Sequence, residues 1–233
     1  GLSNRKNGFV IIKQLKKTFK MNKIYNPQPE TWATICKRPT QSFTDVEETV
    51  KQIFKEVQTK GDQAIIKYAS FFDNVNLQAL EVTAQEIASA KNEISLELKE
   101  AIQLAKSNIY NFHKAQKTEK IEIETTIGVT CWQEKRAIQK VGLYIPGGTA
   151  PLFSTVLMLA IPAKIAGCKE IVMCTPTDKN GNIKPAIVYT AEWCGGNKIY
   201  KVGGIQAIAG MTFGTETLPK VYKIFGPGKQ FVT

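Results

Sequence analysis

Three glycine-rich turns are the residues of this sequence whose types and spacing suggest a binding site. They read IPGG at 145–148, VGG at 202–204 and FGPG at 225–228, and each follows a short apolar run. Glycine lets backbone N–H groups come close to a ligand, and a helix that begins after such a turn favours an anion at its N-terminus. Tight strand-to-helix turns also need glycine for structural reasons, and the spacing is not the G-x-G-x-x-G of dinucleotide-binding turns. Ligand binding and a purely structural role of these glycines therefore both stay open.

The sequence offers little acid–base or metal-binding chemistry beside these turns. Its one histidine, His113, lies in NFHKAQ next to Phe112, which is typical of a packed or capping side chain. No histidine pair, carboxylate cluster or C-x-x-C provides the convergent ligands that zinc needs. There is no G-x-S-x-G motif, and Ser154 has no evident base. The sequence therefore indicates a ligand-binding edge without catalytic residues.

The elements that would position the three turns alternate from residue 141 onward. The pattern predicts strands at 141–145, 170–174, 198–202 and 221–225, with helices at about 151–166, 184–194 and 205–213. The strands begin 29, 28 and 23 residues apart, which is the spacing of βαβ units with right-handed crossovers. We expect an α/β fold: a Rossmann-like parallel sheet with helices on both faces and ligands bound at the carboxyl ends of its strands.

Residues 44–117 read as helices. Thr44-x-x-Glu47 and Thr83-x-x-Glu86 have capping-box spacing, Gly61 is a helix stop and Asp62 is a candidate cap for the next helix. The apolar stripes predict core positions, which include Val46, Val50, Ile53, Phe54, Val57, Ile65, Ile66, Tyr68, Phe72, Leu98, Ala101, Ile102, Ala105, Ile109 and Phe112. Residues 121–136 alternate like a strand pair that turns near Ile127 and Gly128.

The net charge of +11 suggests a nucleic-acid partner until the charges are located. Residues 1–20 hold six of the 31 cations and no acid, so the remainder has 25 cations against 20 acids, a net of +5. Cations scattered among glutamates are typical of an ordinary solvated surface, and no aromatic-plus-basic recognition motif follows. Since Met21 begins MNKIYNPQP like a natural start, we expect residues 1–20 to be a disordered extension or a cloning remnant.

The cysteines and the lengths of the apolar runs indicate the cellular compartment in which the protein is expected. The five cysteines, Cys36, Cys131, Cys168, Cys174 and Cys194, are an odd number with apolar neighbours, which predicts reduced, buried thiols in a cytoplasmic protein. The longest apolar run holds about fourteen residues before Lys164, against roughly twenty for a membrane span. We expect neither a membrane nor a nucleic-acid partner.

Three stretches of the sequence closely resemble the histidinol dehydrogenase family. They are VGLYIPGGTAPLFSTVLMLAIPAKIAGC, VGGIQAIAGMTFGTETLPKVYKIFGPG and the terminal FVT, and GDQAIIKYASFFD and NIYNFHKAQ look like the helical N-terminal region of that family. The resemblance runs from about Met21 to Thr233. It implies a homodimeric, zinc-dependent oxidoreductase that converts L-histidinol through the aldehyde to L-histidine and reduces two NAD+, in histidine biosynthesis.

By position, the resemblance implies NAD contacts at Tyr144 and Gln206. The glycines of the first two turns, Gly147, Gly148, Gly203 and Gly204, belong to the same implied site. The third family position is an asparagine directly after GPG, where this sequence has Lys229. A lysine lacks the paired donor and acceptor of an amide, which puts that contact in doubt, although it could meet a phosphate as a point charge.

The resemblance also implies that the zinc ligands, the catalytic Glu-His pair and most substrate contacts lie beyond Thr233. We therefore expect three regions, namely the extension at 1–20, a helical region with a strand pair at 21–140 that is part of a first domain, and a Rossmann-like domain at 141–233. The chain alone is expected not to turn over histidinol and to hold neither catalytic nor metal-binding residues. The alternative is a catalytically dead nucleotide-binding or assembly module.

Overall fold

The computed structural model describes residues 22–37, 44–148, 150–196 and 198–227, and for residues 44–46 only the backbone. The chain divides into two compact units, 1–42 and 43–233. The described part of the first unit forms the 3-10 helix η1 (Pro29–Thr31) and the short α1 (Trp32–Ile35). Within it the Trp32 indole Nε1–H donates to the Pro27 carbonyl at 3.0 Å.

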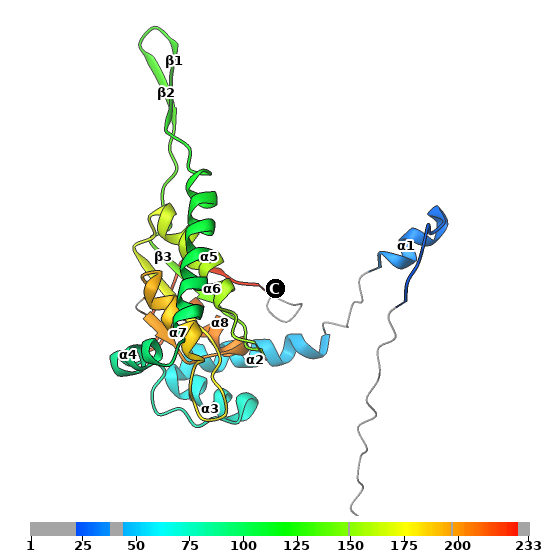
Figure 1. Cartoon of the computed structure of the whole chain (residues 1–233), viewed down its shortest axis with the longest axis vertical. Helices are drawn as coiled ribbons and strands as arrows, with labels where there is room; N and C mark the ends of the chain where they lie inside the picture. The colour runs from blue at the N-terminus through cyan, green and yellow to red at the C-terminus, as the bar shows by residue number, and fades with distance from the viewer. Residues whose placement is uncertain (1–21, 38–43, 149, 197, 228–233) are drawn as a thin grey trace, which may run out of the picture. The chain divides into compact units, whose positions relative to one another are not determined.

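The second unit begins with four helices, shown in cyan to green in Figure 1: α2 (Thr44–Lys60), α3 (Asp62–Asp73), α4 (Ala84–Asn92) and α5 (Leu96–Lys114). The predicted capping box at Thr83 is confirmed, because its side chain accepts from the Glu86 N–H while Glu86 accepts from the Thr83 N–H. The Thr44 box depends on a side chain outside the described residues. Gly61 ends α2 with φ +54°, as predicted.

Asp62 does not cap α3 as predicted. Gly61 occupies the N-cap position, and Asp62 is the first helical residue. Its N–H donates to the Glu216 carboxylate at 2.8 Å, and its own carboxylate accepts from the hydroxyls of Thr215 and Thr217. A side chain 154 residues away thus takes the role of the cap.

The parallel sheet has the predicted strands in the order β5-β4-β3-β6. The strands are β3 (Lys140–Tyr144), β4 (Glu170–Cys174), β5 (Lys198–Tyr200) and β6 (Lys223–Phe225). They alternate with α6 (Phe153–Ala166), α7 (Pro185–Trp193) and α8 (Gly204–Phe213), so the α/β fold is confirmed. β5 and β6 are shorter than predicted.

Helices cover both faces of this sheet. On one face Tyr144, Cys174 and Tyr200 pack in a core with α2, α3 and α8. On the other face Leu143, Met173 and Ile199 pack in a core with α4, α6 and α7. Alternate residues of one strand therefore enter different cores, which explains why these strands read as continuous apolar runs.

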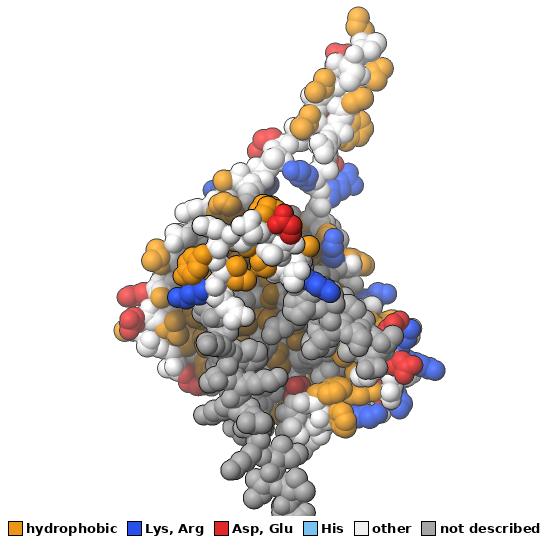
Figure 2. All heavy atoms as spheres, turned by 90° about the vertical axis from the view of Figure 1, so that its right-hand side faces the viewer, with side chains coloured by type: hydrophobic (Ala, Val, Ile, Leu, Met, Phe, Trp, Pro, Cys, Tyr) orange, Lys and Arg blue, Asp and Glu red, His pale blue; other side chains and the backbone are white. Residues whose placement is uncertain are grey.

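The predicted strand pair is an antiparallel hairpin, β1 (Ile121–Thr126) and β2 (Val129–Gln133), with Ile127 and Gly128 at its turn. It projects from the second unit (Figure 1), and hydrophobic side chains are visible along it in Figure 2. Every residue of both strands is exposed, and Ile127 is 97% exposed. None of the hydrophobic cores formed by the described residues includes a residue of the hairpin.

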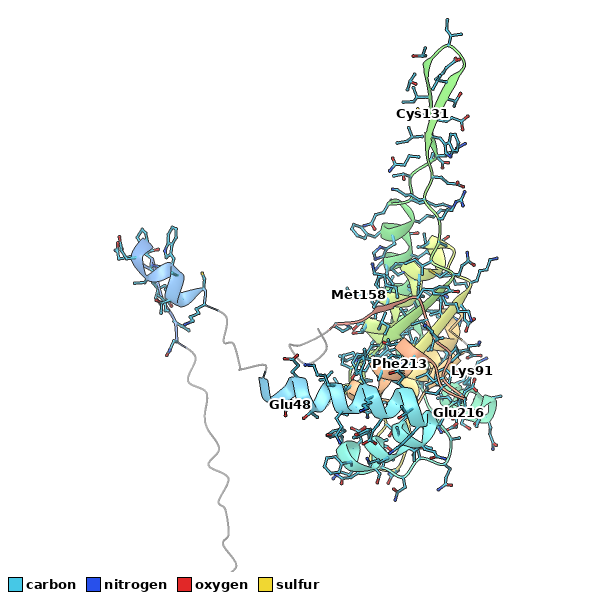
Figure 3. All side chains as sticks on the ribbon, turned by 180° about the vertical axis from the view of Figure 1, so that it is seen from behind. Glu48, Lys91, Cys131, Met158, Phe213 and Glu216 are labelled. Atoms are coloured by element: carbon cyan, nitrogen blue, oxygen red, sulfur yellow. The ribbon has the colours of Figure 1, made fainter. Side chains whose placement is uncertain are left out.

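The hairpin and the helix surfaces correct several predicted core positions. Cys131 on the hairpin (labelled in Figure 3) and Cys36 are exposed, so burial of all five thiols is wrong, while Cys174 and Cys194 are buried as expected. Phe72 and Phe112 are 45% and 65% exposed, and Ala101 is exposed too. The apolar residues of these helices cover a wider part of the helix surface than the neighbouring elements bury. Of the helical positions predicted as core, five are buried: Ile53, Val57, Ile65, Tyr68 and Ile102.

The predicted boundary near residue 140 and the status of residues 1–20 stay predictions. The compact unit 43–233 includes both the helices before that boundary and the sheet after it. None of the helices within the described ranges has the length and apolar character that crossing a bilayer requires.

Candidate functional site at the carboxyl edge of the sheet

The topology of the sheet brings the three glycine turns to one edge. From β3 the chain moves outward through β4 to β5, and then α8 carries it back across the sheet to β6, on the other side of β3. The order of the strands therefore reverses between β3 and β6, and open α/β sheets bind ligands outside the carboxyl ends of the strands at such a switch point. Tyr144 ends β3 and Phe225 ends β6, so IPGG and the described part of FGPG flank this point.

Tyr144 connects the β3 turn to the β5 turn. Its hydroxyl accepts a hydrogen bond from the Gly204 N–H at 3.1 Å, where α8 begins. Burial raises the pKa of this hydroxyl, and the hydrogen bond from Gly204 opposes that rise. The phenol therefore stays protonated at neutral pH, and its own O–H is left to donate to a ligand.

The β6 turn closes on the same residue. A Cβ on Gly226 would lie 2.8 Å from the Tyr144 carbonyl oxygen, a distance that real side chains do not reach. Glycine is required here because the backbones of the β3 and β6 turns are in direct contact. Gly228 and Lys229 lie outside the described residues.

Pro176 holds the β3 and β5 turns together from the side of β4. A Cβ on Gly147 would lie 2.6 Å from Pro176 Cγ, and one on Gly203 would lie 2.5 Å from Pro176 Cβ. Both glycines therefore make room for the same proline ring. Gly147 and Gly203 thus have a structural role that does not depend on a ligand.

Gln206 is the feature that packing does not explain. Its side chain is 1% exposed, yet neither Oε1 nor Nε2 has a hydrogen-bond partner among the described residues. A Cβ on Gly204 would lie 2.9 Å from this Oε1, so the amide rests against the residue that donates to Tyr144. A buried, unpartnered amide costs about 1–3 kcal/mol, and such a group calls for an explanation.

A second unpartnered group lies at the same edge. The Thr175 hydroxyl is buried without a partner in the described part of the chain, directly after β4. Thr175 also lines a cavity of about 150 Å³ together with Gly147, Gly148, Pro176 and Lys184. The Lys184 ammonium donates to the Gly148 carbonyl at 2.9 Å, which brings a positive charge to the IPGG turn. Tyr144 and Gln206 are not part of the cavity lining, since both are buried beneath the α8 side of the sheet.

The described residues contain no group of three or more His, Cys, Asp or Glu side chains that could hold a metal ion. His113 is on the last turn of α5, where its Nδ1 lies 3.0 Å from the Gln116 Oε1. It therefore has a local partner at a helix end. What the edge can do is bind a polar, anionic ligand through backbone N–H groups, an amide and hydroxyls.

Comparison with known proteins decides the family. The family model for histidinol dehydrogenase matches residues 36–233. The chain belongs to the histidinol dehydrogenase family. It is 58% identical over 213 residues to the histidinol dehydrogenase of Bacteroides thetaiotaomicron, covering 91% of this chain and 50% of that protein. With the Escherichia coli K12 enzyme it shares 50% identity over 197 residues, which is 84% of this chain and 44% of that protein.

A solved structure agrees with these relatives. The crystal structure of histidinol dehydrogenase from Elizabethkingia anophelis superposes with a TM-score of 0.85 at 53% identity, covering 89% of this chain and 48% of that one. The chain therefore spans about half the length of the histidinol dehydrogenases it matches.

The site residues predicted from the sequence do not include two residues at this edge of the histidinol dehydrogenase fold, Thr175 and Pro176. Glycine signals close backbone approach, and the turn after β4 contains no glycine. The dipeptide Thr-Pro directly after the buried run EIVMC was the available signal, since proline after a strand marks a turn at the same sheet edge.

Proposed function

We propose that this chain supplies the NAD-binding edge of a histidinol dehydrogenase, an oxidoreductase that converts L-histidinol through the aldehyde to L-histidine with the reduction of two NAD+. The observation that carries the proposal is the Gln206 amide, which is buried and unpartnered beside the Tyr144–Gly204 hydrogen bond. A ligand that pairs with this amide removes the free-energy cost of leaving it without a partner. Membership of the histidinol dehydrogenase family supports the choice of NAD+ as that ligand in this proposal.

The residues at the edge fit a dinucleotide. Gln206 offers an NH2 group with two donor hydrogens and a carbonyl oxygen that accepts, and the Tyr144 hydroxyl offers a further donor. The N-cap of α8 is Gly203, which has no side chain to accept from the first-turn N–H groups. Beyond the Gly204 N–H, which donates to Tyr144, these groups could meet a phosphate. When bound, NAD+ supplies the hydride acceptor for the oxidation of the alcohol.

Zinc does not fit the residues described here, because none of them form a cluster of metal-ligating side chains. We propose that the zinc ligands and the histidine and glutamate that act as acid–base groups belong to polypeptide outside this sequence. The 233-residue chain alone should then bind NAD+ weakly and not turn over histidinol. Formation of NADH from L-histidinol by zinc-supplemented chain, at a rate typical of the family, would contradict this.

A homodimer is part of the same proposal. The large apolar side chains exposed on the β1–β2 hairpin are of the kind that partners cover. Size-exclusion chromatography with light scattering measures the mass in solution directly, and a monomer at all concentrations would count against the dimer.

Calorimetric titration with NAD+ tests the site itself. Gln206→Leu keeps the side-chain size but removes both polar atoms, and we expect at least tenfold weaker NAD+ binding than in the wild type. Gln103→Leu, on the exposed face of α5, makes the same chemical change away from the site and should bind like the wild type. Equal affinity of Gln206→Leu and the wild type would rule out the assignment of Gln206.

A further inference from the structure

A second hollow lies on the other side of the sheet, between α5 and α6, which run side by side (Figure 1), and the end of α7. Its volume is about 500 Å³, within the range of small-molecule sites. Its walls belong to the core that packs on Leu143 and Met173, whereas Tyr144 and Gln206 lie in the α8 core. It is therefore separate from the proposed NAD+ site.

The charges around this hollow are all positive. Of its nine described lining residues four are lysines and none is acidic, and the lysines come from three segments: Lys106, Lys114, Lys117 and Lys164. None of the four forms an ion pair within the described part of the chain, whereas many lysines elsewhere on this surface pair with glutamate. Four unneutralised ammonium groups around one hollow create a positive potential that favours an anion.

One of these lysines is held by its contacts, and a second lies close to it in the fold. The Lys106 ammonium lies 4.2 Å from the centre of the Trp193 ring and donates to the Trp193 carbonyl at 2.8 Å. The Lys164 ammonium lies over the backbone of Gly195, where a Cβ would come within 2.1 Å of it. Both charges act on the buried Cys194 between them: burial raises the pKa of this thiol, and the two lysines oppose the rise. The two ammonium groups thus converge on one end of the hollow.

The helix dipole explains the positions of only two of the four lysines. Lys114 and Lys164 lie in the last turns of α5 and α6, where cations favour the negative end of the helix dipole. Lys106 is in the middle of α5 and Lys117 is beyond its end, so that explanation does not apply to them. The remaining walls are apolar, with Ile161, Ile165 and the Tyr110 ring.

We propose that this hollow binds a small phosphorylated organic molecule, with the lysines around the phosphate and the isoleucine walls against the organic part. Ammonium groups bind phosphate as point charges, and several around one site increase the attraction. The apolar walls predict that an organic group attached to the phosphate improves binding, because burying it removes apolar surface from water.

Trp193 offers a reporter for this site. The other two tryptophans, Trp32 and Trp132, are exposed, and replacing both by phenylalanine leaves Trp193 as the one indole of the chain. In this background phenyl phosphate should change the fluorescence saturably, and more tightly than inorganic phosphate does. No saturable change, or equal affinity for the two compounds, would overturn the proposal.

Two double variants that remove the same charge distinguish binding in the hollow from a general effect of the surface charge. Lys114→Gln combined with Lys117→Gln removes two exposed cations from the hollow, and we expect about tenfold weaker phenyl phosphate binding. Lys55→Gln combined with Lys91→Gln removes two exposed cations from α2 and α4 and should leave the affinity unchanged. Equal losses in both pairs would overturn the proposal. The fluorescence of Trp193, which lines the hollow, reports on this site and not on Gln206, so failure here and failure of the NAD+ proposal are distinguishable.

Discussion

The Tyr144 hydroxyl accepts a hydrogen bond from the Gly204 N–H at 3.1 Å, and this bond ties the end of β3 to the start of α8. The two residues are 60 positions apart, on either side of two βαβ crossovers. The bond satisfies one of the N–H groups that the first turn of a helix leaves without an intrahelical partner. It therefore fixes where the N-terminus of α8 lies relative to the switch point.

Tyr144→Phe removes only the acceptor of this bond. We expect the free energy of unfolding to fall by about 1 kcal/mol, because a partly buried N–H loses its partner. Urea unfolding followed by circular dichroism measures the change. Tyr222→Phe, on a tyrosine that is 69% exposed, is the control and should fall within about 0.5 kcal/mol of the wild type. Equal effects of the two variants would show that the bond contributes no stability.

Gln206→Leu should have the opposite effect on stability. It replaces a buried, unpartnered amide by a side chain of similar size that fits an apolar environment. We expect the free energy of unfolding in the absence of ligand to rise by about 1 kcal/mol, because the cost of leaving the amide unpaired disappears. Urea unfolding of Gln206→Leu beside Gln103→Leu measures it, and a less stable Gln206→Leu would mean that the amide is paired after all.

Together with the expected loss of NAD+ affinity, that gain would describe a residue kept for binding at the expense of stability. Proteins often retain such locally unfavourable groups at functional sites. Neither measurement alone would distinguish this from an ordinary core position.

The spacing of the apolar runs and the positions of the glycines were enough to predict the parallel sheet and the glycine turns at the carboxyl ends of its strands. The apolar runs beginning at Val141, Glu170 and Lys198 are strands within one or two residues, since a parallel strand buried on both faces leaves a continuous apolar signal. That the turns share an edge follows from the parallel order alone. The resemblance to a known family then pointed to Tyr144 and Gln206 within it as expected NAD contacts, which stay predictions.

Contacts between distant segments were beyond this reasoning. The carboxylate of Glu216 at the N-terminus of α3, and Pro176 between Gly147 and Gly203, depend on loops that meet only after folding. The cysteine prediction failed for the same reason. Apolar neighbours in sequence predict burial only if another element covers them, and no described element covers the hairpin around Cys131.

Gly142 gives a prediction about how closely α8 packs on the sheet. A Cβ at this position would lie 2.6 Å from Met211 Sδ and 3.1 Å from Val221 Cγ2. Gly142→Ala should therefore force Met211 out of place and lower the free energy of unfolding by about 1–3 kcal/mol. Gly148→Ala is the control, because the nearest atom to its Cβ would be 3.9 Å away and its φ is not positive. Thermal unfolding compares the two, and equal melting temperatures would show that the α8 interface is looser than described.

Glu86 provides a prediction with a pH dependence. Its carboxylate accepts from the Thr83 N–H at 2.8 Å and pairs with the ammonium of Lys201, which is only 12% exposed. Burial raises the pKa of Glu86, but the hydrogen bonds from Lys201 and Thr83 outweigh it and hold the pKa below its usual 4.5. A carboxyl with a lower pKa in the folded chain contributes stability above the unfolded pKa, and this contribution is lost as the pH falls through the folded value.

Glu86→Gln should accordingly be less stable than the wild type at pH 7, and the difference should shrink as the pH falls below about 4.5. Urea unfolding at pH 7, 5.5 and 3.5 measures this trend. Glu100→Gln, at an exposed position of α5, is the matched control and should differ little from the wild type at any of the three. A pH-independent loss would mean that the lost hydrogen bonds to Thr83, which stabilise the start of α4, and not the charge pair with Lys201, account for the effect.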